Sequence, residues 1–245
     1  MKNKEFDLAC SRVLAGEELS DGFTVYNEQF IHKAVKLYLD PDPSHHEYPL
    51  MGGVADVFSD GEIYEVQTGS FAPLLPKLRR FLSEYKVTLV HPLISLTHHR
   101  WLDRDSGEIS PPPRRSGKPK GLHSLGFELF KIRELIEHPN FSLRVIFLEC
   151  DEFRVLDGWD KSKKRGATLL GKIPLGIIDE ITLKGRDAYK MLLPDTLGKS
   201  FLAKDYMRAI GSRSRYDVYS LRLLTELGFV KRAAKVGNAY LYELP

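Results

Sequence analysis

The chain has 245 residues, of which 42% are hydrophobic and 28% charged, and its formal net charge is +3 at pH 7. This length suits one large domain or two smaller ones, and this apolar fraction is sufficient for a packed core. No apolar run reaches the roughly 18 residues of a membrane helix, and the charged N-terminus has no apolar signal-peptide core. The two cysteines, Cys10 and Cys150, form neither a disulfide framework nor a zinc-binding spacing. These features predict a cytoplasmic protein without a membrane partner.

The first part of the chain alternates helical and extended patterns. Residues 21–40 carry an apolar stripe at helical spacing that ends at Asp40-Pro41, which predicts a helix. After it, in chain order, we expect a loop (41–50), a hairpin (52–71), a helix (71–85), a buried strand (86–93), an exposed irregular segment (95–121), a helix (123–139) and a strand (141–153). This order predicts an α/β fold, in which helices flank a mixed sheet.

The character of the chain changes after this strand. Residues 156–172 hold five cations and three glycines, which is typical of a connector. A helix with a turn (177–194), two helices (200–211 and 213–228) and a hairpin (229–244) are predicted to follow. Two helices and a hairpin indicate a small winged helix-turn-helix domain. The predicted domains are therefore residues 1–158 and 172–245.

The hairpin in "GGVADVFSDGEIYEVQTGSF" carries an unusual pair of acids. Asp60-Gly61 is a strong two-residue turn signal, and the register counted outward from it places Asp56 opposite Glu65, with Gln67 on the same face. Like charges at opposed positions destabilise a sheet. A divalent cation between them reverses this effect, because Mg²⁺ prefers carboxylate oxygens together with phosphate and water. Asp56 and Glu65 are therefore predicted to bind Mg²⁺ or Mn²⁺. The competing interpretation is a solvated hairpin face with ordinary surface acids.

This arrangement resembles the PD-(D/E)XK nuclease superfamily, which has the restriction endonuclease-like fold. The signature of the superfamily is an Asp on one strand, followed on the next by Glu, any residue and Lys, and it falls here on Asp56, Glu65 and Gln67. The resemblance covers residues 22–150. The chain is also similar to a family of uncharacterised bacterial proteins with an EIQTGSF-like segment and a winged-helix tail.

The resemblance implies a catalytic set with one departure. Asp56 and Glu65 would be catalytic metal ligands, but Gln67 stands at the lysine position and cannot stabilise negative charge as an ammonium does. Lys77, in the first turn of the next predicted helix, is the candidate replacement. Glu28 is implied as an accessory acid. For Gln67, Lys77 and Glu28 the alternative is an ordinary polar residue on a strand or helix surface.

Basic residues predict contacts with nucleic acid, because Lys and Arg clusters supply most non-specific affinity for it. The candidates are Arg114, Arg115 and Lys118 in the irregular segment, Arg213, Arg215 and Arg222 on or beside the second helix of the tail, and Lys231, Arg232 and Lys235 on its hairpin. The alternatives are an exposed loop for the first group and a protein-interaction module for the tail.

The expected function is that of a metal-dependent endonuclease or deoxyribonuclease that hydrolyses phosphodiester bonds in DNA, with duplex DNA as partner and a homodimer as a possible assembly. A non-catalytic DNA-binding protein with a degenerate nuclease fold is the runner-up, and an interaction protein that binds no nucleic acid is the third alternative.

Overall fold

The structure is a computed structural model, and it describes residues 3–16, 28–103, 106–109, 114–115, 117–159 and 165–245. The chain divides into two compact units. The first unit consists of Met1–Thr68, Val90–Lys120 and Arg144–Ile181, and the second of Gly69–Leu89, Gly121–Leu143 and Thr182–Pro245. No helix among the described residues is long and apolar enough to cross a membrane.

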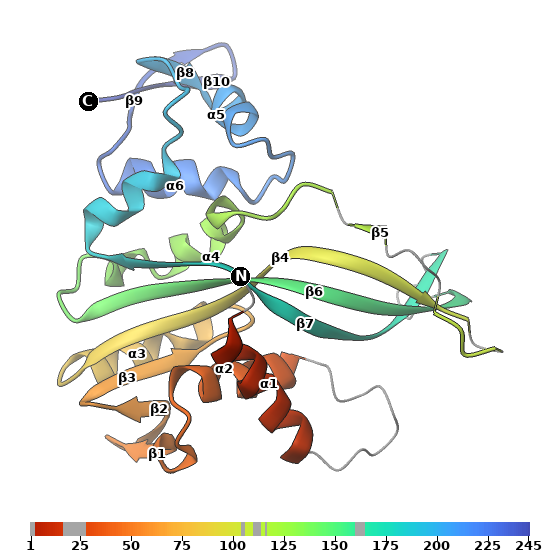
Figure 1. Ribbon diagram of the computed structural model, residues 1–245. Coiled ribbons are helices and arrows are strands. Elements are labelled where there is room, and N and C mark those ends of the chain that lie inside the picture. Colours follow the sequence, from red (N-terminus) through yellow and green to blue (C-terminus); the bar gives the residue numbers. More distant parts are fainter. Residues whose placement is uncertain (1–2, 17–27, 104–105, 110–113, 116, 160–164) are drawn as a thin grey trace. The chain divides into compact units, whose positions relative to one another are not determined.

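The first unit is an α/β structure with a mixed sheet and helices packed against it (Figure 1). Its helices are α1 (Lys4–Gly16) and α2 (Glu28–Leu39), and its strands are β1 (His46–Leu50), β2 (Gly53–Ser59), β3 (Glu62–Val66), β5 (Arg114–Arg115) and most of β4 (Lys86–Leu102), β6 (Phe141–Trp159) and β7 (Arg165–Lys184). The strand order is β1-β2-β3-β4-β6-β7, with β5 paired to β4. The predicted α/β class and flanked mixed sheet are confirmed.

The apolar stripe of α2 builds the core of this unit. Its buried residues are Phe30, Ile31, Ala34 and Val35, whose spacing puts them on one side of a helix. They pack in one cluster with residues of α1 and with Val66, Val90, Ile146, Leu148 and Cys150 of the sheet. The helix ends at Leu39, as Asp40-Pro41 predicted. The predicted start of this helix, residues 21–27, lies outside the described part of the chain, and α1 was not predicted.

The predicted hairpin is confirmed. The β2–β3 ladder has the expected register: the pairs are Val57 with Tyr64, Phe58 with Ile63 and Ser59 with Glu62. Asp60 and Gly61 have φ angles of 51° and 76°, the left-handed values that a tight hairpin turn of this type requires.

A second hairpin precedes this one, where a loop was predicted at residues 41–50. That prediction was wrong, because β1 pairs antiparallel with β2 through a turn at Met51 and Gly52, whose φ angles are 51° and 69°. A methionine at a left-handed position is not a recognised turn signal, which is why the sequence did not reveal this strand.

Part of the segment predicted as irregular, and every described residue of the predicted connector, are strands. β4 continues to Leu102, β5 pairs with it, and β6 and β7 extend through most of residues 156–172. Residues 160–164 lie outside the described part of the chain. Charged residues occupy these strands because they pair with each other, as Arg100 does with Asp151 (Nε to Oδ2 2.6 Å). The division into domains at 158 and 172 stays a prediction.

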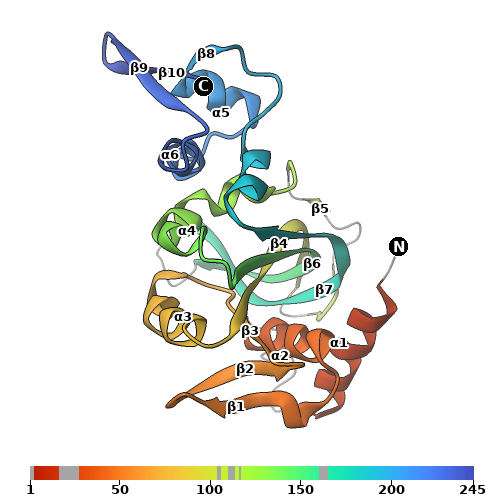
Figure 2. The same ribbon diagram turned by 90° about the vertical axis from the view of Figure 1, so that its left-hand side faces the viewer.

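The second unit holds the remaining helices and a smaller sheet. These elements are α3 (Leu75–Leu82), α4 (Gly126–Lys131), α5 (Ala203–Ala209), α6 (Val218–Glu226), β8 (Ser200–Leu202), β9 (Lys231–Val236) and β10 (Ala239–Glu243), and the small sheet has the order β8-β10-β9 (Figure 2).

Two helix predictions need correction in this unit. The helix predicted over 123–139 is a succession of a 3₁₀ turn, the short α4 and a second 3₁₀ turn. The helix predicted over 177–194 begins as the end of β7 and continues as a 3₁₀ helix (Arg186–Leu192). The helices predicted over 71–85 and 213–228 are present as the shorter α3 and α6, and that over 200–211 as β8 and α5.

Close packing of α4 on α6 fixes one face of α6. A Cβ on Gly126 would lie 2.3 Å from the Ser220 Oγ and 2.5 Å from the Ser220 backbone nitrogen, which is closer than side chains approach. The Ser220 hydroxyl also donates to the His123 carbonyl at 3.1 Å. Ser220 is fully buried as a result.

Candidate carboxylate site

Three acids lie in one row across the first three strands. The register of β1 on β2 places Glu47 at the position opposite Asp56. The register of β2 on β3, continued by one residue, places Asp56 at the position opposite Glu65. The hairpin therefore brings the predicted pair together, and β1 adds a third carboxylate that the sequence reasoning did not include.

Hydrogen bonds to backbone groups link the central pair across the strands. The Val66 N–H donates to Asp56 Oδ2 at 2.8 Å, and the Asp56 N–H lies 3.4 Å from Glu65 Oε1. Glu65 is only 1% exposed, whereas Asp56 is partly exposed. Hydrogen bonds from N–H groups stabilise a carboxylate, so they offset part of the repulsion between the two acids.

Basic side chains of α2 lie against Asp56 and Glu47, two of the three acids of the row. His32 Nε2 is 3.4 Å from Asp56 Oδ2, and the Lys36 ammonium forms an ion pair with Glu47. His32 and Lys36 are four residues apart, so they share one face of the helix. Glu47 has a φ of 49°, a left-handed conformation that costs free energy for a residue with a side chain. A strained acid paired to a buried lysine is a feature that points to function.

The backbone of Gln67 is held between β3 and β4. Its N–H donates to the Val90 carbonyl at 2.9 Å, and His91 Nδ1 lies 2.5 Å from the Gln67 carbonyl. Because a carbonyl only accepts hydrogen bonds, His91 carries its proton on Nδ1 and presents an unprotonated Nε2 when neutral. His91 is 6% exposed. Gln67 is therefore positioned by its main chain, two residues after the buried Glu65.

A pocket of about 320 Å³ lies beside this row. It is lined by Gln29, His32, Lys33, Lys36, Glu47 and Thr68, all of which belong to the first unit. The site thus has an open space next to it that a small polar group can enter.

Asp56 and Glu65 suit a hard cation in chemistry and in number. Mg²⁺ is typically held by one or two carboxylates, with water and phosphate as its other ligands. No group of three or more His, Cys, Asp or Glu among the described residues has the arrangement of a metal site. The donor set therefore fits a cation bound jointly by the protein and a phosphate, and does not fit a closed structural metal site.

The other predicted residues belong to other elements, and some of their side chains are not described. Lys77 is on α3 in the second unit, where its Nζ is 5.7 Å from the centre of the Phe81 ring. Glu28 is the first residue of α2, and its side chain is not described. The side chains of Arg114 and Arg115 are not described either, and Lys118 is exposed.

The predicted nucleic-acid contacts of the tail are all exposed. They are Arg213 and Arg215 before α6, Arg222 on it, and Lys231, Arg232 and Lys235 on β9. Several lie on aromatic rings: the guanidinium of Arg222 is 4.5 Å from the centre of the Tyr219 ring and that of Arg232 is 4.7 Å from the Tyr240 ring.

Part of the "EVQTGSF" segment has a structural role that the sequence reasoning missed. Glu128 accepts hydrogen bonds from the Phe71 N–H (2.8 Å) and from the Ser70 hydroxyl (3.0 Å), and Phe71 is fully buried. Only its position in chain order, after a buried strand, could have indicated that this loop is anchored.

The fold and the acidic row define an α/β protein with a carboxylate site on adjacent antiparallel strands. Residues 29–184 match the domain of unknown function DUF8091, and because this is more than half of the chain, the protein belongs to that family. The matched range runs from α2 to the end of β7 and contains the whole row.

One relative is an uncharacterized protein of Treponema pallidum (strain Nichols), 26% identical over 217 residues, which are 88% of this chain and 84% of the relative. No solved structure gives a significant match.

Proposed function

We propose that this protein is a metal-dependent, nuclease-like enzyme that hydrolyses phosphodiester bonds in DNA. The observation that carries the proposal is the buried Glu65 beside the partly exposed Asp56 on the next strand. The order of elements around it (helix, hairpin, helix, strand, helix, strand) supports the resemblance to the restriction endonuclease-like fold.

Each residue has a distinct role in this proposal. Asp56 and Glu65 would hold Mg²⁺ or Mn²⁺, which supplies water activation and charge stabilisation when bound. The Gln67 amide would orient the attacking water by hydrogen bonding. Lys77, at the start of α3, is the proposed source of the positive charge that Gln67 lacks. Since a helix N-terminus also favours anions, this position suits contact with a phosphate.

The C-terminal elements are proposed to form a winged helix that holds DNA. The order β8, α5, α6, β9, β10 and the sheet β8-β10-β9 support this interpretation. One face of α6 is covered by α4, so the proposed DNA contacts come from the exposed side of α6 and from β9.

The second candidate is a DNA-binding protein that has lost catalysis. The uncharged Gln67 at the position of the motif lysine is the observation that favours it. The two candidates differ in cleavage and agree in DNA binding, so both properties must be measured on the same preparation.

A cleavage assay on linear, nicked and branched DNA, with Mg²⁺ and then Mn²⁺, tests the enzyme proposal. Asp56→Asn is the sharpest variant, because the amide oxygen can still accept the Val66 N–H while the negative charge is lost. We expect the wild type to cleave and Asp56→Asn to lose at least about tenfold in rate. Glu62→Gln, in the same hairpin, is the matched control and should cleave normally.

Lys77→Ala tests the relocated cation, with Arg80→Ala on the same helix as its control. We expect Lys77→Ala to lose cleavage and to keep its affinity for DNA. The control Arg80→Ala should keep both. Equal cleavage by wild type and Lys77→Ala would refute this role of Lys77. A wild type that binds every substrate and cleaves none identifies the non-catalytic alternative, and one that binds no DNA excludes both candidates.

A further inference from the structure

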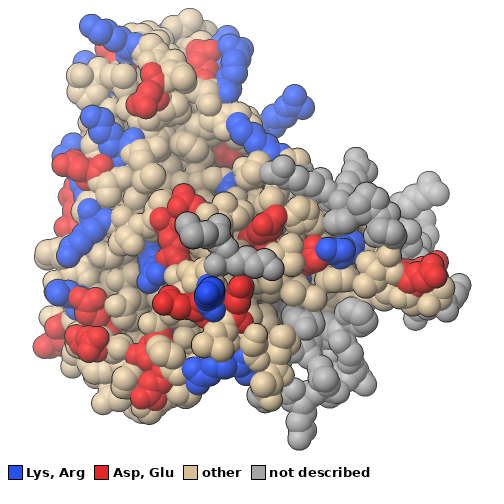
Figure 3. Space-filling view, viewed as in Figure 1, with Lys and Arg blue, Asp and Glu red and all other residues tan. Residues whose placement is uncertain are grey.

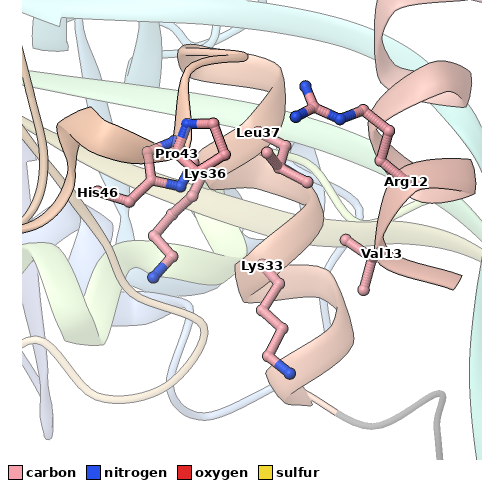
Figure 4. A pocket seen from close by; sticks show the side chains of 7 residues that line it. All are labelled: Arg12, Val13, Lys33, Lys36, Leu37, Pro43 and His46. Atoms are coloured by element: carbon pink, nitrogen blue, oxygen red, sulfur yellow. The ribbon is translucent and has the colours of Figure 1, made fainter. Parts of the chain in front are cut away.

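A pocket between α1 and α2 gathers basic side chains from three segments of the first unit (Figure 4). Arg12 projects from α1, Lys33 and Lys36 from successive turns of α2, and His46 from the start of β1. Its volume is about 340 Å³, and Val13, Leu37 and Pro43 complete its lining. We call this space the basic pocket.

Arg12 and Lys33 give the basic pocket a positive charge. No Asp or Glu occurs among the described residues that line it. The guanidinium of Arg12 donates to the Pro41 carbonyl at 2.7 Å, and His46 Nε2 donates to the Asp40 carbonyl at 2.8 Å. These partners are neutral, so they orient the side chains without cancelling charge.

Lys36 is the most unusual member, because it is only 7% exposed. A buried ammonium is costly without a partner. Its partner is Glu47, whose side chain is 60% exposed. Glu47 belongs to the carboxylate row, so the pocket is tied to the candidate site through one ion pair.

The basic pocket and the pocket beside the carboxylate row are neighbours. Lys33 and Lys36 line both of them. An anion bound in the basic pocket therefore lies next to the space that His32 and Glu47 border. A nuclease needs neighbouring pockets of this kind if it binds one phosphate of a strand in the first while another phosphate of the same strand reaches the carboxylates.

We propose that the basic pocket binds the terminal phosphate of a nucleic-acid strand, an inference that rests on the proposed function for the identity of the strand. A terminal phosphate carries a charge of about −1.5 to −2 at pH 7, whereas a phosphodiester carries one negative charge. A concave site in which Arg12 and Lys33 add positive charge beside the Lys36–Glu47 ion pair matches the higher charge. The pocket also has a volume at the lower end of the usual range for small-ligand sites, roughly 300–1,000 Å³.

The test compares two otherwise identical oligonucleotides, with and without a terminal phosphate and labelled at the opposite end. Each strand end is phosphorylated in turn. Affinity is measured by fluorescence anisotropy on the full chain in EDTA, so no bound metal or catalysis contributes. We expect the wild type to bind the phosphorylated strand about tenfold more tightly or better, as a charge-assisted contact implies.

Lys33→Ala and Arg12→Ala should each reduce that preference several-fold, because both side chains line the pocket and are exposed. Lys4→Ala removes the same charge from an exposed position on α1, eight residues from Arg12, and should leave the preference unchanged. Inorganic phosphate should compete with the phosphorylated strand.

The outcomes separate this inference from the proposed function. DNA binding with equal affinity for both strands overturns the terminal-phosphate site and leaves the DNA-binding proposal standing. Binding of inorganic phosphate, lost in Lys33→Ala, without any DNA binding supports the pocket and overturns nucleic acid as its ligand. Binding of neither probe overturns both.

Discussion

Asp56 carries two kinds of contact at once. Its carboxylate accepts the Val66 N–H from the neighbouring strand and lies 3.4 Å from His32 of α2. Both contacts fix the position of the carboxylate, whose charge a metal or a substrate would use. The same oxygen thus contributes to stability and to the proposed chemistry, so the two must be separated by the choice of substitution.

Asp56→Ala should lower the free energy of unfolding by about 1–3 kcal/mol, because the Val66 N–H loses its acceptor in a partly buried position. Asp56→Asn should lower the free energy of unfolding clearly less, since its side-chain oxygen replaces that acceptor. Urea unfolding followed by circular dichroism measures both. Equal losses for the two substitutions would mean that the hydrogen bond to Val66 contributes little.

Glu128 makes the stability of the second unit pH-dependent. Partial burial raises the pKa of its carboxyl, but hydrogen bonds from the Lys131 ammonium, the Phe71 N–H and the Ser70 hydroxyl outweigh it, so the pKa lies below its ordinary value of 4.5. A carboxyl with a depressed folded-state pKa stabilises the fold above the unfolded-state value. That contribution is lost as the pH falls through the folded-state pKa.

The quantity to compare is the free energy of unfolding of the wild type and of Glu128→Gln. The wild type should be more stable from pH 6 to 8, and the difference should shrink as the pH falls below about 4.5. Chemical denaturation across this pH series measures it. A difference that stays constant down to pH 3 would show that Glu128 acts through packing and not through charge.

At the scale of elements, the contact between α4 and α6 decides how α6 can act. Buried residues occupy one side of α6, and Ser220 is enclosed by Gly126 of α4. Its exposed side, including Arg222, remains available to a ligand. A winged helix normally offers its second helix to the DNA major groove. If the proposed winged helix binds DNA in this way, α4 limits the approach to one face of α6.

Gly126→Ala should destabilise the protein by about 1–3 kcal/mol, because the added Cβ meets the Ser220 backbone and hydroxyl. Thermal and urea unfolding measure this loss. Gly121→Ala is the matched control, because a Cβ there meets no atom within 4 Å and the residue has a φ of −104°. Similar stability of the two variants would mean that α4 and α6 separate easily.

At the scale of the whole molecule, the net charge is modest. The net charge is +3, and on the face shown in Figure 3 the described acidic and basic side chains are interspersed, without a continuous basic surface. Under the proposed function, affinity for DNA comes from local clusters of cations. Such a protein should bind DNA weakly at physiological salt and respond to the loss of a few cations.

The double substitution Arg213→Ala and Arg215→Ala tests this expectation in the full chain. Each lost phosphate contact reduces the slope of log affinity against log salt by about 0.9, so the pair should reduce it by about 2. Lys190→Ala, at an exposed position of the same unit, serves as the control. An unchanged slope would remove these arginines from the proposed DNA interface.

Local signals made the hairpin and the main helices predictable. Asp60-Gly61 determines a tight turn, and the alternation of the flanking residues then fixes which positions are opposed. The stripe of α2 and the prolines at the start of α3 are equally local. The central acids of the site, Asp56 and Glu65, were identified from the sequence because their proximity follows from that one turn.

The sequence by itself determined an α/β fold, the β2–β3 register and the opposition of two carboxylates. Only the tertiary structure added Glu47, His32 and Lys36 to them, since contacts of these side chains join segments with no common local pattern. The same is true of the end of β6 and the start of β7, which look like a charged connector until their partners are known. Charged side chains are compatible with either state, and it is cross-strand pairing, a property of the folded chain, that decides between them.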